Sequence, residues 1–183
     1  MNQVRITGGI NRSRIIKFGV KQSNIRPTPD RVRETIFNWL DQDLTNKTCL
    51  DLFAGSGILG FEALSRNAKQ VIMVEKEVNT CNQLKINKNL LKIENLAIYL
   101  KDGIEYLKIT PTKFDVVFLD PPYTSDLLQQ SLKLILTKNI LNPNGVIYIE
   151  FADIPDLGGY DILKKGKAGM VKYALIKPEI LLK

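Results

Sequence analysis

From residue 49 onward, short apolar segments alternate with segments of helical periodicity, and this alternation constrains the fold more than any other feature of the chain. The apolar segments are 49–53, 70–75, 96–100, 115–119 and 146–151, and the amphipathic segments between them are 57–67, 77–91, 103–109 and 126–138. Parallel strands need crossover connections, which are usually helices. Two last segments, 160–164 and 170–177, flank a Lys-Gly-Lys-Ala-Gly turn and predict an antiparallel C-terminal hairpin. The pattern therefore predicts an α/β, doubly wound, mostly parallel seven-stranded sheet.

The first 48 residues have a different pattern. Segments 4–7 and 14–20 alternate and flank polar residues, which predicts a small β-hairpin. Thr28-Pro-Asp30 is typical of a helix start, with Thr28 as the N-cap and proline in the first helical position. The residues that would face the core from this helix are Val32, Ile36, Phe37 and Leu40. We therefore expect a hairpin-and-helix extension at 1–48 and an α/β domain at 49–183.

Positive charge is concentrated in the extension. The chain has 26 Lys and Arg and 19 Asp and Glu, a net charge of +7, and residues 1–48 hold nine of the bases and four of the acids. A basic arm of this kind is typical of proteins that contact a polyanion, although a solvated basic tail remains an alternative. The candidate phosphate contacts are Arg5, Arg12, Arg14, Lys17 and Arg26.

The composition excludes several classes of site. The chain has no histidine, which excludes His-based triads, HExxH zinc sites and histidine general bases. Cys49 and Cys81 form no CxxC pair and are predicted to be free thiols in a reducing cytoplasm. No apolar run is long enough for a membrane span, and the N-terminus has no signal-peptide pattern. We expect a cytoplasmic monomer without a metal site.

The first apolar segment leads into a glycine-rich turn. Residues Gly55-Ser-Gly57, with Gly60, form a G-x-G-x-x-G pattern between the expected strand and helix. Glu75 ends the next expected strand, at the spacing of an acid that binds a ribose diol. This pattern supports binding of an adenosine-containing cofactor and leaves open nicotinamide dinucleotide and S-adenosylmethionine.

Acidic residues favour S-adenosylmethionine. Asp51 precedes Gly55 by four residues, where a carboxylate would disfavour a pyrophosphate and suit a cationic amino group. Asp102, after the third strand, could accept a hydrogen bond from an adenine amine, cap a helix, or do both. The predicted cofactor-binding residues are Thr28, Asp51, Ala54, Gly55, Ser56, Gly57, Glu75, Asp102 and Gly103.

The sequence Asp120-Pro-Pro-Tyr123 follows the apolar run 116–119. The aspartate accepts hydrogen bonds, the prolines provide carbonyls without competing N–H groups, and the tyrosine ring can stack. These groups suit a planar ring that bears an exocyclic amine, as nucleobases do. A simple strand-to-loop turn is the alternative. The predicted catalytic residues are Asp120, Pro121, Pro122 and Tyr123.

Four segments together resemble one family: Asp51–Gly57, Glu62–Arg66, Phe118–Tyr123 and Arg26–Leu40. They are similar to bacterial 16S ribosomal RNA guanine-N2 methyltransferases of the RsmD type, and the resemblance covers nearly the whole chain. It implies a Rossmann-like methyltransferase sheet, S-adenosylmethionine as cofactor, and a guanine of 16S rRNA in the small ribosomal subunit as substrate. Asn67 stands where the family usually has glycine.

The resemblance also implies a mechanism. Asp120 and the Pro121 carbonyl would accept the two N–H bonds of the guanine amine, while Tyr123 stacks on a flipped-out base. Arg26-Pro27-Thr28 and Phe37 could close over the methionine end of the cofactor, although Phe37 also suits simple helix packing. An adenine-N6 methyltransferase acting on RNA or DNA and a non-catalytic RNA-binding assembly factor remain alternatives.

Overall fold

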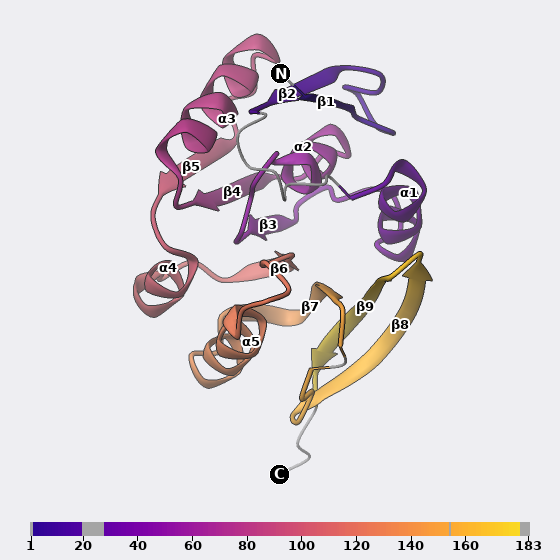
Figure 1. Ribbon diagram of the computed structural model, residues 1–183, viewed down its shortest axis with the longest axis vertical. Helices are drawn as coiled ribbons and strands as arrows, with labels where there is room; N and C mark the ends of the chain where they lie inside the picture. The colour runs from indigo at the N-terminus through magenta and orange to yellow at the C-terminus, as the bar shows by residue number, and fades with distance from the viewer. Residues whose placement is uncertain (1, 20–27, 154, 180–183) are drawn as a thin grey trace.

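A computed structural model describes residues 2–19, 28–153 and 155–179 (Figure 1). Its centre is a seven-stranded sheet with the strand order β5-β4-β3-β6-β7-β9-β8, and a separate two-stranded sheet, β1-β2, lies beside it. The strands are β1 (Asn2–Arg5), β2 (Ile15–Phe18), β3 (Thr48–Asp51), β4 (Gln70–Glu75), β5 (Leu96–Leu100), β6 (Phe114–Leu119), β7 (Leu141–Phe151), β8 (Tyr160–Ala168) and β9 (Val171–Pro178). The helices are α1 (Asp30–Trp39), α2 (Ile58–Ser65), α3 (Val78–Leu90), α4 (Gly103–Ile109) and α5 (Leu127–Thr137).

The strand directions confirm the predicted fold class. Strands β3 to β7 pair in parallel, and β9 pairs antiparallel with both β7 and β8. The chain winds outward from β3 through β4 to β5 and then returns to the other side of β3 as β6. The sheet therefore has a topological switch point between β3 and β6, where open α/β folds bind ligands.

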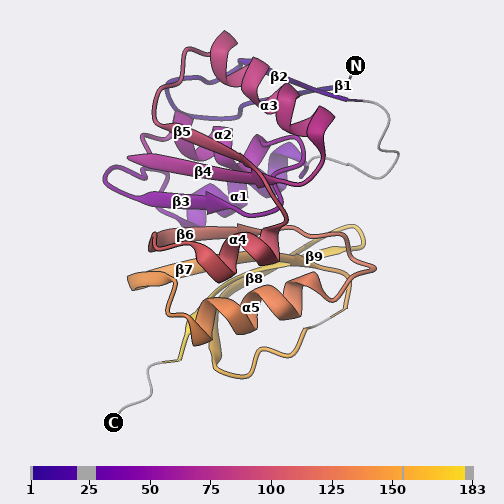
Figure 2. The ribbon, with the colours of Figure 1, turned by 90° about the vertical axis from the view of Figure 1, so that its left-hand side faces the viewer.

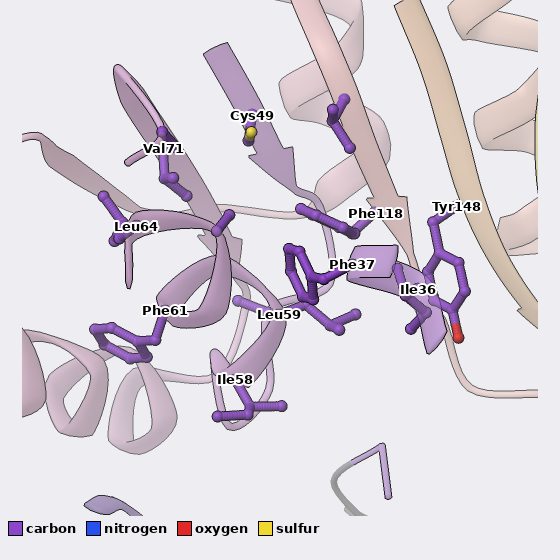
Figure 3. Close-up of a cluster of buried hydrophobic side chains, with 14 of the residues drawn as sticks. Ile36, Phe37, Cys49, Ile58, Leu59, Phe61, Leu64, Val71, Phe118 and Tyr148 are labelled. Atoms are coloured by element: carbon purple, nitrogen blue, oxygen red, sulfur yellow. The ribbon is translucent and has the colours of Figure 1, made fainter. Parts of the chain in front are cut away.

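Helices cover both faces of the sheet (Figure 2). One hydrophobic cluster joins α1, α2, α3 and the β1-β2 hairpin to the sheet, and a second joins α4 and α5 to the opposite face. Figure 3 shows Phe37 of α1 pointing towards Phe118 of β6, and their ring centroids are 5.9 Å apart. Phe37 is fully buried, so its position is that of a packing residue.

A buried ion cluster fastens the N-terminal extension to α2. Glu62 Oε1 accepts hydrogen bonds from Arg33 Nε at 3.0 Å and from the Thr7 amide at 2.7 Å, and its Oε2 contacts Arg66. Arg33 also donates to the backbone carbonyl of Arg5 at 2.6 Å. Residues 1–48 and the α/β domain therefore share both a core and an ion cluster.

Capping preferences in the sequence predict Thr28 as the N-cap of α1 and Ser125 as the N-cap of α5, and both predictions are wrong. Pro29 occupies the N-cap position of α1, and the Thr28 hydroxyl instead donates to Glu150 Oε1 at 2.8 Å. Asp126 is the N-cap residue of α5, because Ser125 donates to the Pro122 carbonyl at 2.6 Å and belongs to the preceding turn. In both cases a nearby acceptor competes with the helix for the hydroxyl.

Several boundaries and orientations also differ from prediction. Helical periodicity in the sequence predicts that Val78 and Leu136 face inward, but both are exposed. Val78 lies about 120° around α3 from the buried Leu84, given about 100° per residue. Strand β7 begins at Leu141, and residues 142–145 bulge between its pairs with β6. Asn67 follows the expected helix 57–67 at the position where the sequence predicts a left-handed helix stop, and its φ of 67° confirms that prediction.

Candidate active site

The turn between β3 and α2 lies at the switch point. Gly55 and Gly57 have φ of 51° and 75°, and a Cβ atom on Gly57 would lie 2.5 Å from Leu84 Cδ2. Both the left-handed backbone and the tight packing therefore require glycine at residue 57. The neighbouring Ala54 and Ser56 are buried.

Glu75 reaches this turn from the end of β4. Its Oε2 accepts a hydrogen bond from the Gly55 amide at 2.9 Å, and its Oε1 accepts one from the Glu77 amide at 2.8 Å. The glycine turn and the predicted ribose-binding acid are thus in direct contact, although they are 20 residues apart in sequence. This is the relation that the sequence pattern predicts for an adenosine site.

Asp102 and Gly103 begin α4 beyond β5. Asp102 Oδ1 accepts hydrogen bonds from the amides of Ile104 and Glu105, at 2.9 Å and 3.1 Å. Asp102 is therefore the helix cap that the sequence allowed. Gly103 is tightly packed, because a Cβ atom there would lie 2.8 Å from Phe53 Cε1.

Asp51 is buried at the end of β3. Its Oδ2 accepts a hydrogen bond from the Gly60 amide at 3.1 Å. Burial raises its pKa to about 7, although the hydrogen bond from Gly60 opposes the rise. Asp51 can therefore be neutral or charged near neutral pH, and a nearby cation would favour the charged form.

The predicted catalytic tetrapeptide follows β6 on the other side of the switch point. Asp120 is the first residue after the strand, and Pro121 is buried behind it. Burial, followed by the charges of Glu150 and Asp51, raises the pKa of Asp120 well above its usual value. Tyr123 keeps 48% of its surface exposed, which leaves ring area available for stacking.

Glu150 of β7 is a site residue that the sequence interpretation missed. Its Oε1 accepts hydrogen bonds from the hydroxyls of Thr28 and Tyr148, both at 2.8 Å, and its Oε2 accepts one from the Tyr123 hydroxyl at 3.2 Å. Burial raises the pKa of Glu150, while the three hydroxyls oppose the rise. The available signal was a single acid inside the apolar run 146–151.

Asp51, Asp120 and Glu150 form a cluster of buried or half-buried acids at the ends of β3, β6 and β7, three neighbouring strands. Within residues 2–19, 28–153 and 155–179, no Lys or Arg lies within ion-pair distance of any of them. Buried carboxylates without a cation are unfavourable in their charged form. These three carboxylates therefore fit a ligand that carries a positive charge, as the sulfonium and ammonium groups of S-adenosylmethionine do.

A pocket of about 260 Å³ adjoins the acid cluster. It lies between the loop that follows β6, the start of α5 and the end of β7. Its lining residues are Pro121, Pro122, Tyr123, Ser125, Asp126, Leu128, Gln129, Glu150, Phe151, Ala152, Asp153 and Pro155. Because Tyr123 and Glu150 both line it, the pocket is a candidate acceptor site.

Two of the predicted phosphate-binding residues, Arg12 and Arg14, lie away from this pocket. Both arginines lie in the turn between β1 and β2. This turn contacts the C-terminal end of α2, where the Ile10 amide donates a hydrogen bond of 2.7 Å to the Ser65 carbonyl. The turn is therefore at the sheet edge opposite the glycine turn. Arg5 and Lys17 are exposed on β1 and β2, and Arg26 lies outside the described residues.

Within the described residues, no group of three or more acids, cysteines or histidines is arranged to hold a metal ion. The same part of the chain contains no helix that is both long and apolar enough to cross a membrane. Cys49 and Cys81 are buried and free.

Known proteins match the chain over almost its full length. The family model described as "Conserved hypothetical protein 95" matches residues 4–177. Ribosomal RNA small subunit methyltransferase D of Haemophilus influenzae is 41% identical over 94% of this chain and 93% of its own length. The protein of the same name from Escherichia coli K12 is 37% identical over 97% and 91%.

This chain belongs to the RsmD family of methyltransferases. A solved structure described as "Putative methyltransferase yhhF from Escherichia coli" superposes with a TM-score of 0.88 at 36% identity and covers 97% of this chain and 99% of that one. The family membership confirms the resemblance found in the sequence, and the superposition confirms the methyltransferase fold. A second solved structure, described as "putative methylase HI0767 from Haemophilus influenzae", has a TM-score of 0.82 at 39% identity.

Proposed function

We propose that this RsmD-family protein transfers a methyl group from S-adenosylmethionine to the exocyclic N2 of a guanine in 16S rRNA of the small ribosomal subunit. The names of the relatives support rRNA as the substrate class. The observation that carries the proposal is Asp120, whose pKa is raised by burial beside an exposed aromatic ring and a pocket. We further propose that the protein works in the cytoplasm as a monomer.

The residues around the switch point would hold the cofactor. The Gly55–Gly57 backbone allows close approach, Glu75 offers carboxylate oxygens to the ribose hydroxyls, and Asp102 to the adenine amine. Asp51 would lie near the positively charged methionine end. When bound, S-adenosylmethionine supplies an electrophilic methyl group on a sulfonium.

The residues after β6 would hold and activate the acceptor. The lone pair of a guanine amine is delocalised into the ring, so alignment and electrostatics are needed to make it reactive. Asp120 and the Pro121 carbonyl would accept the two N–H bonds, and Tyr123 would stack on the base. Glu150 fixes the Tyr123 hydroxyl at 3.2 Å and so restricts the ring that contacts the base.

Asp120 would also take the proton that the reaction releases. An N–C bond forms, the S–C bond breaks, and the amine loses one proton. Asp120 is ionised while a positive charge lies beside it, and its pKa rises again when methyl transfer removes that charge. A carboxylate with a raised pKa is a better proton acceptor than an ordinary surface aspartate.

The test is transfer of labelled methyl groups to unmodified small ribosomal subunits, naked 16S rRNA and DNA, followed by identification of the methylated nucleoside. We expect N2-methylguanosine from the ribosomal samples, and the ratio of subunit to naked RNA would identify the substrate state. N6-methyladenine would replace the proposed target. Absence of transfer by a protein that still binds the cofactor would contradict the proposal.

A further inference from the structure

The net positive charge of the α/β domain is concentrated in the β8–β9 hairpin. Residues 160–178 include five lysines and one acid, Asp161, whereas the rest of 49–183 has 12 basic and 14 acidic residues. The hairpin therefore has a net charge of +4 and the remainder of the domain −2. A charge difference of this size directs the approach of a charged partner.

Three of the five lysines share one face of the sheet. Ala174 and Ile176 of β9 belong to the core beneath α4 and α5, and side chains alternate along a strand, so Lys172 projects on that side. Lys167 pairs with Lys172, and Lys165 pairs with Ala174. Cross-strand partners project on the same face. We call Lys165, Lys167 and Lys172 the basic face; the first two are exposed and the third is half-buried.

The basic face borders the candidate acceptor pocket. Lys172 pairs directly with Phe151, and Phe151 both lines the pocket and packs against the core beneath α5. The tip of the hairpin lies at the same edge of the sheet as the loop that follows β6 (Figure 2). In contrast, the turn containing Arg12 and Arg14 lies at the opposite edge.

Charge within the protein does not explain the basic face. Lysines directly opposite each other in a sheet are destabilising, and no described acid is within ion-pair distance of these lysines. The adjoining pocket contains acids, namely Asp126, Glu150 and Asp153, with Asp120 beside it. A polyanion would be repelled from this pocket unless cations beside it bound the phosphates.

We propose that the basic face of the β8–β9 hairpin binds the phosphate backbone of the RNA strand next to the target nucleotide. This proposal rests on the proposed function and deepens it by naming the docking surface. Moving one base out of the stack and into the pocket requires unstacking energy. Contacts between the basic face and the flanking phosphates would hold the strand in place during this step.

The first experiment compares two triple variants of the full chain. Lys165→Gln/Lys167→Gln/Lys172→Gln neutralises the basic face, and Lys47→Gln/Lys69→Gln/Lys113→Gln removes the same charge from exposed positions just before β3, β4 and β6, at the opposite edge. Binding of naked 16S rRNA is measured as a function of salt, together with cofactor affinity and methyl transfer. We expect the hairpin variant to bind RNA about tenfold or more weakly, with a salt slope smaller by about 2, and the control to change by less than threefold.

A single reversal separates RNA binding from folding. Lys167→Glu places opposite charges across from each other at Lys172, so the thermal unfolding midpoint should stay or rise while RNA binding falls. Unchanged RNA binding by the hairpin variants, or equal losses in both triple variants, would overturn the proposal. Wild-type protein that binds RNA through this face without methylating it would contradict the proposed function and leave the docking surface intact.

Discussion

Two buried glutamates in this protein have opposite surroundings. Glu62, on α2, is fully buried and contacts two arginines, Arg33 and Arg66. Glu150, on β7, is 3% exposed, and its hydrogen-bond donors among the described residues are all hydroxyl groups. Its charge acts on Asp120. The first carboxylate has its charge balanced within the fold, whereas the second lies in a cluster of acids at the ligand-binding edge.

The difference indicates different roles. Removing one partner from a buried ion pair leaves an uncompensated charge and is strongly destabilising. Acids that lie together without a cation instead have raised pKa values and respond to a charged ligand. The Glu62 cluster is therefore expected to govern stability, and the Asp120–Glu150 cluster to govern catalysis.

Replacing Asp120 should have the largest effect. Asp120→Asn removes the proton acceptor while keeping shape, so kcat should fall about 10³–10⁴-fold, equivalent to about 4–5.5 kcal/mol. Cofactor affinity should remain close to wild type, and thermal stability should be unchanged or higher because a buried acid is lost. Turnover within tenfold of wild type in the methyl-transfer assay would exclude this role.

Replacing Arg33 should have the largest effect on stability. Arg33→Met leaves Glu62 with one arginine and removes the hydrogen bonds to Thr28 and Arg5, so the free energy of unfolding should fall by about 3–5 kcal/mol. Chemical denaturation measures this change. Arg31→Met, at an exposed position on the same helix, is the matched control and should change stability by less than about 0.5 kcal/mol. Equal effects would show that the buried cluster is not the anchor.

Glu150→Gln should alter the pH dependence more than the maximal rate. The negative charge of Glu150 raises the pKa of Asp120, so neutralising it should lower that pKa. Because Asp120 must be ionised to accept N–H bonds, the acid limb of kcat/KM should move to lower pH. Glu105→Gln makes the same charge change at an exposed position and should leave the limb in place. A limb that moves to higher pH in Glu150→Gln would contradict the coupling.

The smallest expected effect is the proton release from Asp51 when the cofactor binds. With a pKa of about 7, roughly half of the Asp51 carboxyls are protonated at pH 7, and a bound cation should release up to about half a proton. Titration calorimetry in buffers of different ionisation enthalpy measures this release, which should vanish at pH 9 and shrink in Asp51→Asn.

The same pKa has a consequence for the free protein. The folded-state pKa of Asp51 is raised above the ordinary value of 3.8, so its contribution to stability is fully present below about pH 4 and is lost as pH rises through about 7. Asp51→Asn should therefore stabilise the cofactor-free protein more at pH 8 than at pH 4. Equal stabilisation at both values would show that Asp51 does not titrate in this range.

Features that depend on neighbouring residues were predictable. The glycine turn and Glu75 follow from strand–turn–helix spacing, and the structure brings them into contact as that pattern requires. The ends of β4, β5, α4 and the left-handed Asn67 were also predicted well, because they depend on local periodicity and local backbone preferences.

Features that depend on distant residues were not predictable in the same way. Thr28 satisfies the sequence rules for a helix cap, yet its hydroxyl is used by Glu150, 122 residues away. Glu150 itself looked like one polar residue in a buried strand. The net charge of each segment drew attention to the N-terminal arginines. It overlooked the lysines of β8 and β9, because the acids in the rest of the α/β domain offset their charge in the net value.

The order of strands and helices, the family and the residues at the end of each parallel strand could be read from the amino-acid sequence, since strand periodicity and turn chemistry are encoded in adjacent residues. Which charged side chains contact one another was set by the tertiary fold. It paired Glu62 with Arg33, placed Glu150 beside Asp120 without a cation among the described residues, and set one basic turn far from the pocket and one basic face beside it. Electrostatic interactions depend on distance and burial in space, and neither can be read from separation along the chain.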